Sequence, residues 1–163
     1  MKTLLIIRHA KSSWDNASVT DIDRPLNDRG RRDAPAMAQR LIKANINIEL
    51  FVSSPARRAR STAALFIHEF GRKEGEILLI PALYHAPVQT FKEVVAGLDD
   101  RYGSAAIFSH NPGITAFVNT LTSVRLDNMP TCGIFAVTGL ATKWSEFLTA
   151  ETTFWFLDYP KKE

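Results

Sequence analysis

The chain has 163 residues, of which 45% are hydrophobic, and this length and composition fit one domain with a conventional core. Twenty Lys and Arg against 17 Asp and Glu give a formal net charge of +3, too mild a bias to indicate a nucleic-acid surface. The single cysteine, Cys132, excludes an internal disulfide and favours a reducing compartment. No apolar run approaches the ~18 residues that cross a bilayer, and Arg8 ends the first run too early for a signal peptide. We therefore expect a soluble cytoplasmic protein without membrane contact, folded as a single domain over residues 1–163.

Short apolar runs rich in Ile, Val and Phe alternate with longer amphipathic stretches, a pattern typical of a largely parallel sheet covered by helices. We expect strands at residues 3–7, 48–53, 76–80, 104–109, 133–138 and 153–158. Apolar residues at helical spacing predict helices around residues 34–42, 59–70 and 91–102. Gly30 and Pro35 predict an irregular start for the first helix, and Thr90 with Glu93, at capping-box spacing, predict the start of the third. The predicted fold class is α/β, with three layers and a mostly parallel six-stranded sheet.

Two stretches, FVSSPARR and IFSHNPGI, share one design in which a buried strand runs into a helix. Ser54 and Asn111 are the expected helix N-caps, and Pro55 and Pro112 are the expected first helical residues. Each stretch therefore places a helix N-terminus at the carboxyl end of a strand. Ligands of open α/β sheets bind at that edge, and helix N-termini favour anions there.

Arg8 and His9 end the first predicted strand in the same way. If this strand is parallel and adjacent to those ending at Ser53 and Ser109, the sheet edge brings together Arg8, His9, His110 and the arginines of SPARRARSTA. Guanidinium groups bind phosphoryl oxygens bidentately and stay charged at any relevant pH. The pattern therefore predicts a phosphate site.

The histidines at this edge suggest chemistry beyond binding. A neutral imidazole can attack phosphorus and carry the phosphoryl group as a covalent intermediate. The surrounding donors then neutralise the charge on the equatorial oxygens, which supplies most of the catalysis in phosphoryl transfer. No metal or cofactor is required, since cationic side chains take its place. Activity should fall as the pH drops through the imidazole range, unless neighbouring arginines lower the pKa of the attacking histidine.

Three motifs in order, RHAK, SSPARRARSTA and FSHNPG, resemble the signatures of the histidine phosphatase superfamily, which has the phosphoglycerate-mutase-like fold. The resemblance spans essentially the whole chain. The short length, RHAKS in place of the RHGE common in mutases, and DIDRPLNDRGRRDA look like the SixA-type phosphohistidine phosphatase branch.

The resemblance implies a role for each matching residue. His9 is implied as the nucleophile, Arg8 as a phosphate clamp beside it and His110 as the second histidine. The helical wheel does not choose between Arg58 and Arg60 as the second clamp, but the motif places it at Arg58. The remaining arginines of that motif are then solvated or at the rim. Further candidates for phosphate or substrate contact are Ser12, His85, Asn111 and Thr131.

The chain departs from the broader family in one respect. Many members carry a glutamate after the third strand as general acid, whereas the corresponding stretch here reads IPALYHAPVQTFKEVV. A nitrogen leaving group or an acidic alcohol needs less help from an acid than an alkoxide does. The missing acid therefore favours phosphohistidine, carried by a phosphocarrier or histidine-phosphotransfer domain. Side chains that could fill part of the gap are those of Asp21, Asp23, Tyr84 and His85.

Other interpretations stay open. One is a phosphatase of a small phosphorylated metabolite, and another is a phosphoryl-binding module without turnover. A metal site of His9, His85 and His110 matches no zinc spacing and is disfavoured by the nearby arginines. Cys132 lacks the Cys-x5-Arg pattern of a thiol nucleophile. A nucleic-acid surface would rest on Arg29, Arg31, Arg32, Arg57, Arg58 and Arg60, without any aromatic interleaving.

Overall fold

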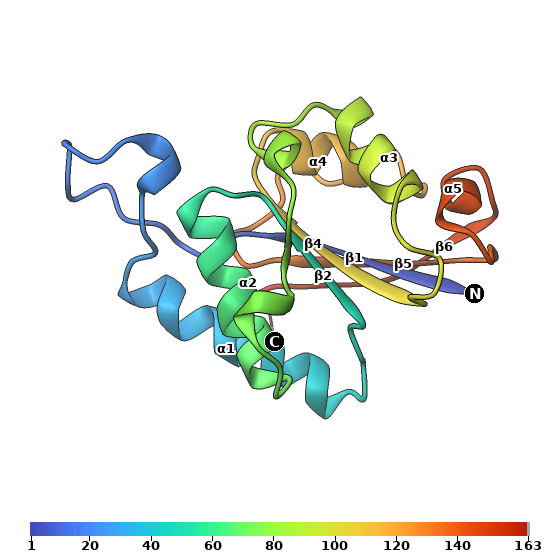
Figure 1. Cartoon of the computed structure of the whole chain (residues 1–163), viewed down its shortest axis with the longest axis horizontal. Coiled ribbons are helices and arrows are strands. Elements are labelled where there is room, and N and C mark those ends of the chain that lie inside the picture. Colours follow the sequence, from blue (N-terminus) through green and yellow to red (C-terminus); the bar gives the residue numbers. More distant parts are fainter. Residues whose placement is uncertain (163) are drawn as a thin grey trace.

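Residues 1–162, which the computed structural model describes, form a six-stranded sheet with helices on both faces (Figure 1). The strands are β1 (Lys2–Arg8), β2 (Leu50–Ser53), β3 (Leu78–Leu79), β4 (Ser104–Ser109), β5 (Ile134–Gly139) and β6 (Thr152–Asp158). The α-helices are α1 (Asp28–Lys43), α2 (Arg57–Glu69), α3 (Val88–Ala96), α4 (Gly113–Val118) and α5 (Trp144–Phe147). Single 3-10 turns are η1 (Asp21–Asp23), η2 (Glu74–Glu76) and η3 (Pro81–Leu83). The predicted three-layer α/β fold is confirmed.

The order of the strands is β3-β2-β4-β1-β5-β6. Strands β1 to β4 are parallel, and β5 runs antiparallel to both of its neighbours. The register pairs Arg8 with Ser109, and Ser53 with Phe108, so β1, β2 and β4 end at the same edge of the sheet. The predicted adjacency of these three strand ends is therefore confirmed.

Two apolar layers hold the fold together, one on each face of the sheet. Helices α1 and α2 cover one face, and α3, α4 and α5 cover the other (Figure 1). Successive side chains of β1 alternate between these layers, because a strand points neighbouring residues to opposite faces. Both faces are buried, which explains why the central strands read as continuous apolar runs rather than alternating ones. Among residues 1–162, no helix combines the length and the apolarity needed to cross a bilayer.

Helix α1 corrects the prediction of an irregular start. The helix begins regularly at Asp28, and the side chain of Asn27 accepts a hydrogen bond from the backbone N–H of Gly30 at 2.9 Å. This N-cap satisfies one of the donors that the first turn leaves unpaired. Pro35 lies inside the helix, and α1 continues through it to Lys43.

The other predicted helix starts were also misplaced. Helix α2 begins at Arg57 and α4 at Gly113, each later than the predicted caps at Ser54 and Asn111. Ser54 still accepts a hydrogen bond from the N–H of Ala56, at 3.2 Å, in the turn before α2. Helix α3 begins at Val88, so the Thr90 side chain is not its cap. These cap predictions were wrong because a short polar side chain can form the same hydrogen bonds in a turn as at a helix start.

Gly30 marks a close backbone contact between α1 and the segment that follows β1. A Cβ atom at this position would lie 2.2 Å from the carbonyl oxygen of Lys11. That carbonyl also accepts a hydrogen bond from the backbone N–H of Asn27 at 3.0 Å. Only glycine leaves room for this approach, so α1 begins where it does partly because residue 30 has no side chain.

We expect Gly30→Ala to lower the free energy of unfolding by about 2 kcal/mol, because the Lys11 backbone must move to admit the new methyl group. Urea denaturation followed by circular dichroism measures the change. Gly75→Ala is the matched control, since a Cβ there meets no atom within 4 Å, and it should change stability by less than about 0.5 kcal/mol. Equal effects of the two substitutions would contradict the close contact.

Candidate active site

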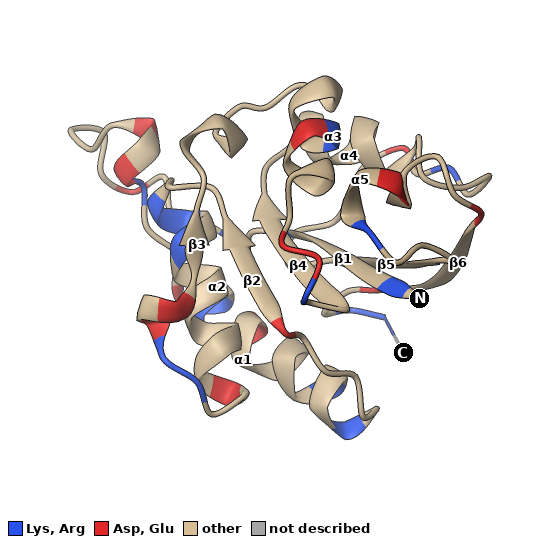
Figure 2. Cartoon of the chain, turned by 45° about the vertical axis from the view of Figure 1, so that its right-hand side comes forward, with Lys and Arg blue, Asp and Glu red and all other residues tan. Residues whose placement is uncertain are grey.

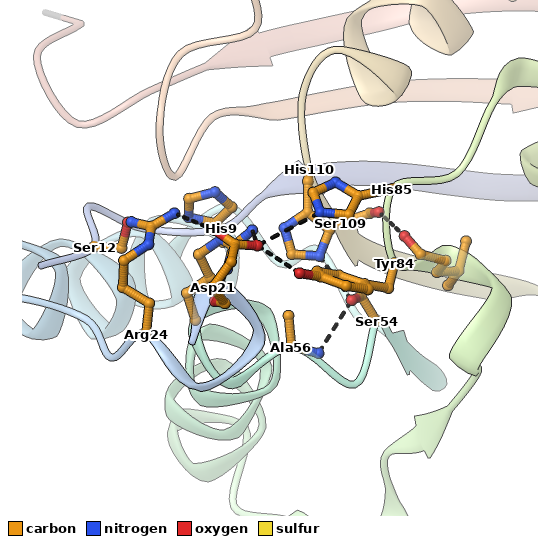
Figure 3. Close-up of polar contacts among 12 residues, drawn as sticks. His9, Ser12, Asp21, Arg24, Ser54, Ala56, Tyr84, His85, Ser109 and His110 are labelled. Atoms are coloured by element: carbon orange, nitrogen blue, oxygen red, sulfur yellow. Dashed lines mark hydrogen bonds and ion pairs between the residues drawn. The ribbon is translucent and has the colours of Figure 1, made fainter. Parts of the chain in front are cut away.

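The ends of β1, β2 and β4 surround a pocket of about 260 Å³, whose polar contacts are drawn in Figure 3. Its lining comprises Arg8, His9, Ser12, Arg58, His85, His110, Asn111 and Thr131, which are the eight predicted site residues, together with Lys11, Trp14, Asp21 and Arg24. The structure therefore brings all eight of these predicted site residues to one pocket. Of the other arginines in the α2 motif, Arg57 is exposed and Arg60 is half-buried, and neither lines the pocket.

His9 is held rigidly at the base of the pocket. Its backbone N–H donates to the carbonyl of Ser109 at 3.1 Å, and its own carbonyl accepts from the N–H of Cys132 at 3.0 Å. The ring nitrogen Nδ1 lies 2.7 Å from the carbonyl oxygen of Ala10. Because a carbonyl oxygen only accepts, Nδ1 carries the proton of the neutral ring, and Nε2 carries the lone pair. The backbone thus selects the tautomer that leaves Nε2 nucleophilic.

Burial keeps both central histidines neutral. Desolvation, reinforced by the charges of Arg58 and Arg8 and partly offset by the bond to Ala10, lowers the pKa of His9 to about 3. Desolvation also lowers the pKa of His110 to about 3, with the neighbouring His9 and Arg58 adding to the effect. If His9 is the nucleophile, activity is therefore expected to fall only near pH 3, and not in the ordinary imidazole range, because burial adds to the effect of the arginines.

Neutral burial of two imidazoles makes stability depend on pH. The pKa of each ring is lower in the folded chain than in the unfolded chain, so below about pH 6.5 the unfolded state binds more protons. The free energy of unfolding therefore decreases as the pH falls, by up to about 1.4 kcal/mol per pH unit for each ring. We expect the two rings together to account for a loss on the order of 5 kcal/mol between pH 7 and pH 4.5, measured by urea denaturation.

The variant His9→Asn/His110→Asn isolates this contribution, because it lacks both titrating rings while other groups titrate as before. Its unfolding free energy should change less between pH 7 and pH 4.5 than that of the wild type. Parallel pH profiles for the two proteins would show that the histidines are not buried in the neutral form.

Two arginines flank His9 with donors that the protein leaves unpaired. Arg8 donates to the carbonyl oxygen of Met129 at 2.8 Å, and its Nε is buried without a partner among residues 1–162. Arg58, whose side chain is only 4% exposed, likewise has a buried Nε without a partner. Burial and the charge of Arg58 together lower the pKa of Arg8. An anion with several oxygens would offset the repulsion between the two guanidinium groups and would accept hydrogen bonds from their unpaired donors. By contrast, no group of three or more His, Cys, Asp or Glu side chains within residues 1–162 could hold a metal ion.

Asp21 closes the pocket from the long segment between β1 and α1. Its Oδ2 accepts from the hydroxyl of Tyr84 at 2.5 Å and from Arg58 at 3.1 Å, and its carbonyl accepts from Arg58 at 2.7 Å. The hydrogen bond from Tyr84 and the charge of Arg58 hold the pKa of Asp21 well below its usual range. Figure 2 shows the acidic turn η1 beside the basic first turn of α2. Asp21 therefore offsets part of the positive charge of the pocket, whereas Asp23 does not line it.

The same segment contributes three residues that the sequence prediction missed: Lys11, Trp14 and Arg24. The guanidinium carbon of Arg24 lies 3.5 Å from the centroid of the Trp14 ring, and Arg24 also donates to Ser12 Oγ. Residues 9–20 contain no helix or extended strand, so no periodic pattern indicated which side chains fold over the pocket. The motif RHAKS contains Lys11 and the stretch DIDRPL contains Arg24, whereas no motif contains Trp14.

The remaining candidates lie at the opposite wall. Asn111 donates to Asn128 Oδ1 at 2.8 Å and to the carbonyl of Met129 at 3.2 Å. Thr131 lines the pocket beside them, while the adjacent Cys132 is fully buried. Burial raises the pKa of the Cys132 thiol, so this group stays protonated and is a poor nucleophile.

Comparisons with known proteins identify the class. A model of the histidine phosphatase superfamily, branch 1, matches residues 4–83. An uncharacterised protein of Mycobacterium leprae is 31% identical over 151 residues, which cover 85% of this chain and 89% of that protein. The chain belongs to the histidine phosphatase superfamily, as its motifs predict.

Solved structures agree on the fold. The protein histidine phosphatase SixA, in complex with tungstate, superposes with a TM-score of 0.82 at 23% identity over 97% of each chain. A mycobacterial glucosyl-3-phosphoglycerate phosphatase in complex with VO3 gives a TM-score of 0.73 at 18% identity, over 94% of this chain and 97% of that one. At these identities the likeness concerns the fold, which is the predicted phosphoglycerate-mutase-like one.

Proposed function

We propose that this protein is a metal-independent phosphatase that works through a covalent phosphohistidine on His9. The observation that carries the proposal is the fixed tautomer of His9, whose Nε2 lone pair lies in a pocket lined by two arginines with unpaired donors. Nε2 attacks phosphorus, and Arg8 and Arg58 bind the oxygens of the group in transfer. Water then cleaves the phospho-His9 bond.

His110 and the pocket wall complete the phosphate site in this proposal. The ring of His110 lies 5.4 Å from that of His9, measured between centroids, and its Nδ1 is buried without a partner in residues 1–162. In this proposal Ser54 Oγ–H donates to Nε2 of His110, so Nδ1 carries the ring proton and donates to a phosphoryl oxygen. Ser12, Asn111 and Thr131 then contact the phosphoryl group or the part of the substrate next to it.

We propose phosphohistidine on a protein as the substrate, for which the size of the pocket is one support. A volume of about 260 Å³ is below the ~300–1,000 Å³ of sites that enclose a whole small molecule. The phosphoryl group fits inside, and the rest of the substrate stays outside, as a phosphorylated side chain on a partner domain would. The fold shared with SixA, described as a protein histidine phosphatase, supports the same substrate class. A phosphocarrier or histidine-phosphotransfer domain is the expected partner.

A second candidate substrate is a small phosphorylated metabolite. It is favoured by the likeness of fold to a glucosyl-3-phosphoglycerate phosphatase. The two candidates differ in kcat/KM, which should be higher by orders of magnitude for the true class of substrate. A comparison of one phosphohistidine protein with a panel of sugar phosphates therefore separates them.

The proposal predicts a trapped intermediate. Wild-type protein mixed with ³²P-labelled phosphohistidine protein or aryl phosphate, and quenched in alkaline detergent, should carry label that is stable in alkali and lost in acid. His9→Ala should carry none and should lose turnover by at least about a thousandfold, because it lacks the attacking nitrogen. Activity that survives in His9→Ala would refute the mechanism.

Arg58→Ala and Arg57→Ala form a matched pair of variants on neighbouring residues of α2. Arg58 is buried against the pocket, and Arg57 is exposed outside it. We expect Arg58→Ala to slow formation of the phosphoenzyme by about a hundredfold or more, and Arg57→Ala to leave the rate unchanged. The rate of labelling in a quenched-flow experiment provides the measurement, and equal rates for the two variants would contradict a phosphate clamp at Arg58.

A further inference from the structure

The position of His9 determines where the leaving group departs. In phosphoryl transfer the attacking and leaving atoms lie roughly in line with phosphorus. His9 is 6% exposed and lies at the base of the pocket, so a leaving group opposite to it points toward the mouth. A proton donor for the leaving group must therefore be at the mouth.

Four side chains near the mouth carry or accept protons: those of Lys11, Asp21, Tyr84 and His85. Asp21 is ionised, since its neighbours hold its pKa well below the usual range. The hydroxyl of Tyr84 donates a hydrogen bond to Asp21, and burial together with that carboxylate raises the pKa of Tyr84. An ammonium group such as that of lysine is ordinarily a weaker acid than imidazolium by about four pKa units. An imidazole is the group best suited to give up a proton near neutral pH.

Several contacts fix His85 at this place. Its Nε2 lies 3.5 Å from Asp21 Oδ2, and its ring packs against that of Tyr84 with 4.0 Å between centroids (Figure 3). The residue has a φ of 54°, a left-handed conformation that a non-glycine side chain adopts at some cost. Such strain persists where the surrounding structure imposes it, and it is found often at functional sites.

The segment around His85 is tied to the end of β4. Ser109 Oγ donates to the carbonyl of Leu83 at 2.8 Å, immediately before this segment. On the other side, a Cβ at Gly113 would lie 2.0 Å from the carbonyl oxygen of Ala86, so the backbone packs directly on the start of α4. The imidazole is therefore positioned by the same strand end that positions His110, although its side chain is 58% exposed.

We infer that His85 is the general acid of the reaction, with Asp21 as its positioning residue. This inference rests on the proposed function. The titratable and charged groups around His85 are Asp21, Tyr84 and His110, and Arg58 lies on the same carboxylate oxygen of Asp21. An acid in this place widens the substrate class from phosphohistidine to phosphate monoesters with poor leaving groups.

The proposed reaction consists of two successive displacements at phosphorus. Nε2 of His9 forms a bond to phosphorus while the bond from phosphorus to the leaving oxygen or nitrogen breaks, and the bonding pair stays on the leaving atom. That atom takes the proton from Nδ1 of His85, while Nε2 of His85 keeps its own proton, directed toward Asp21. Neutral His85 then accepts a proton from water, as the water oxygen bonds to phosphorus and the bond to His9 breaks. One water is consumed, and phosphate and the protonated leaving group are released.

A series of leaving groups tests the role of His85. We use kcat/KM, which reports only the steps up to phosphoenzyme formation, for 4-nitrophenyl phosphate, phenyl phosphate and glycerol phosphate. His85→Asn tolerates the left-handed backbone. We expect this variant to lose about a hundredfold or more on glycerol phosphate and less than about threefold on 4-nitrophenyl phosphate, whose leaving group needs no acid.

Two further variants sharpen the test. His85→Gly relieves the backbone strain and leaves space, so added imidazole should restore hydrolysis of glycerol phosphate but not change that of 4-nitrophenyl phosphate. His68→Asn replaces an exposed histidine on α2 outside the pocket and should change neither rate.

Each outcome bears on one claim. An equal loss on all three substrates in His85→Asn, or no loss on any, would overturn the role of His85 while phosphoenzyme on His9 still forms. Absence of phosphoenzyme in the wild-type protein would instead overturn the proposed function.

Discussion

Positive charge without a full complement of anions is the dominant feature of this protein's pocket. Arg8 and Arg58 are held beside His9, and burial together with the charge of Arg58 lowers the pKa of Arg8 and of His9. Proteins rarely bury guanidinium groups with unpaired donors, because each costs desolvation energy that nothing returns. The proposed phosphoryl group would supply the missing charge and acceptors. Burial, reinforced by these charges, keeps His9 neutral and leaves its lone pair available.

The segment between β1 and α1 offsets part of this positive charge through Asp21. It projects beyond the sheet, as Figure 1 shows, and returns through η1 to place Asp21 against Arg58. Asp21 is shared between α2 and the segment after η3, since it also accepts from Tyr84 and lies near His85. One carboxylate thus contacts both Arg58, the proposed phosphate clamp, and His85, the proposed acid.

The sheet supplies the rigidity that this arrangement needs. His9, Ser54 and His110 each follow a parallel strand of the central trio β2, β4 and β1, and Ser54 Oγ lies 2.7 Å from Nε2 of His110. Both faces of these strands are buried, so movement of one strand end requires repacking of an apolar layer. The parts of the pocket that derive from strand ends are therefore fixed, and the parts that derive from the segment before α1 are held mainly by polar contacts.

The sequence by itself determined the α/β architecture, the adjacency of three strand ends and the meeting of Arg8, His9, Arg58 and His110. These features follow from apolar periodicity and from motifs at strand ends, which are local in the chain and survive any reasonable packing. Helix boundaries were less predictable, because Ser54, Thr90 and Asn111 satisfy the local rules for a cap without serving as one. Only the tertiary structure decided that Asp21, Trp14 and Arg24 fold over the pocket and that His9 is neutral with its proton on Nδ1. The physical reason is that burial, loop placement and the choice of tautomer depend on groups distant in the chain, whose proximity no local pattern encodes.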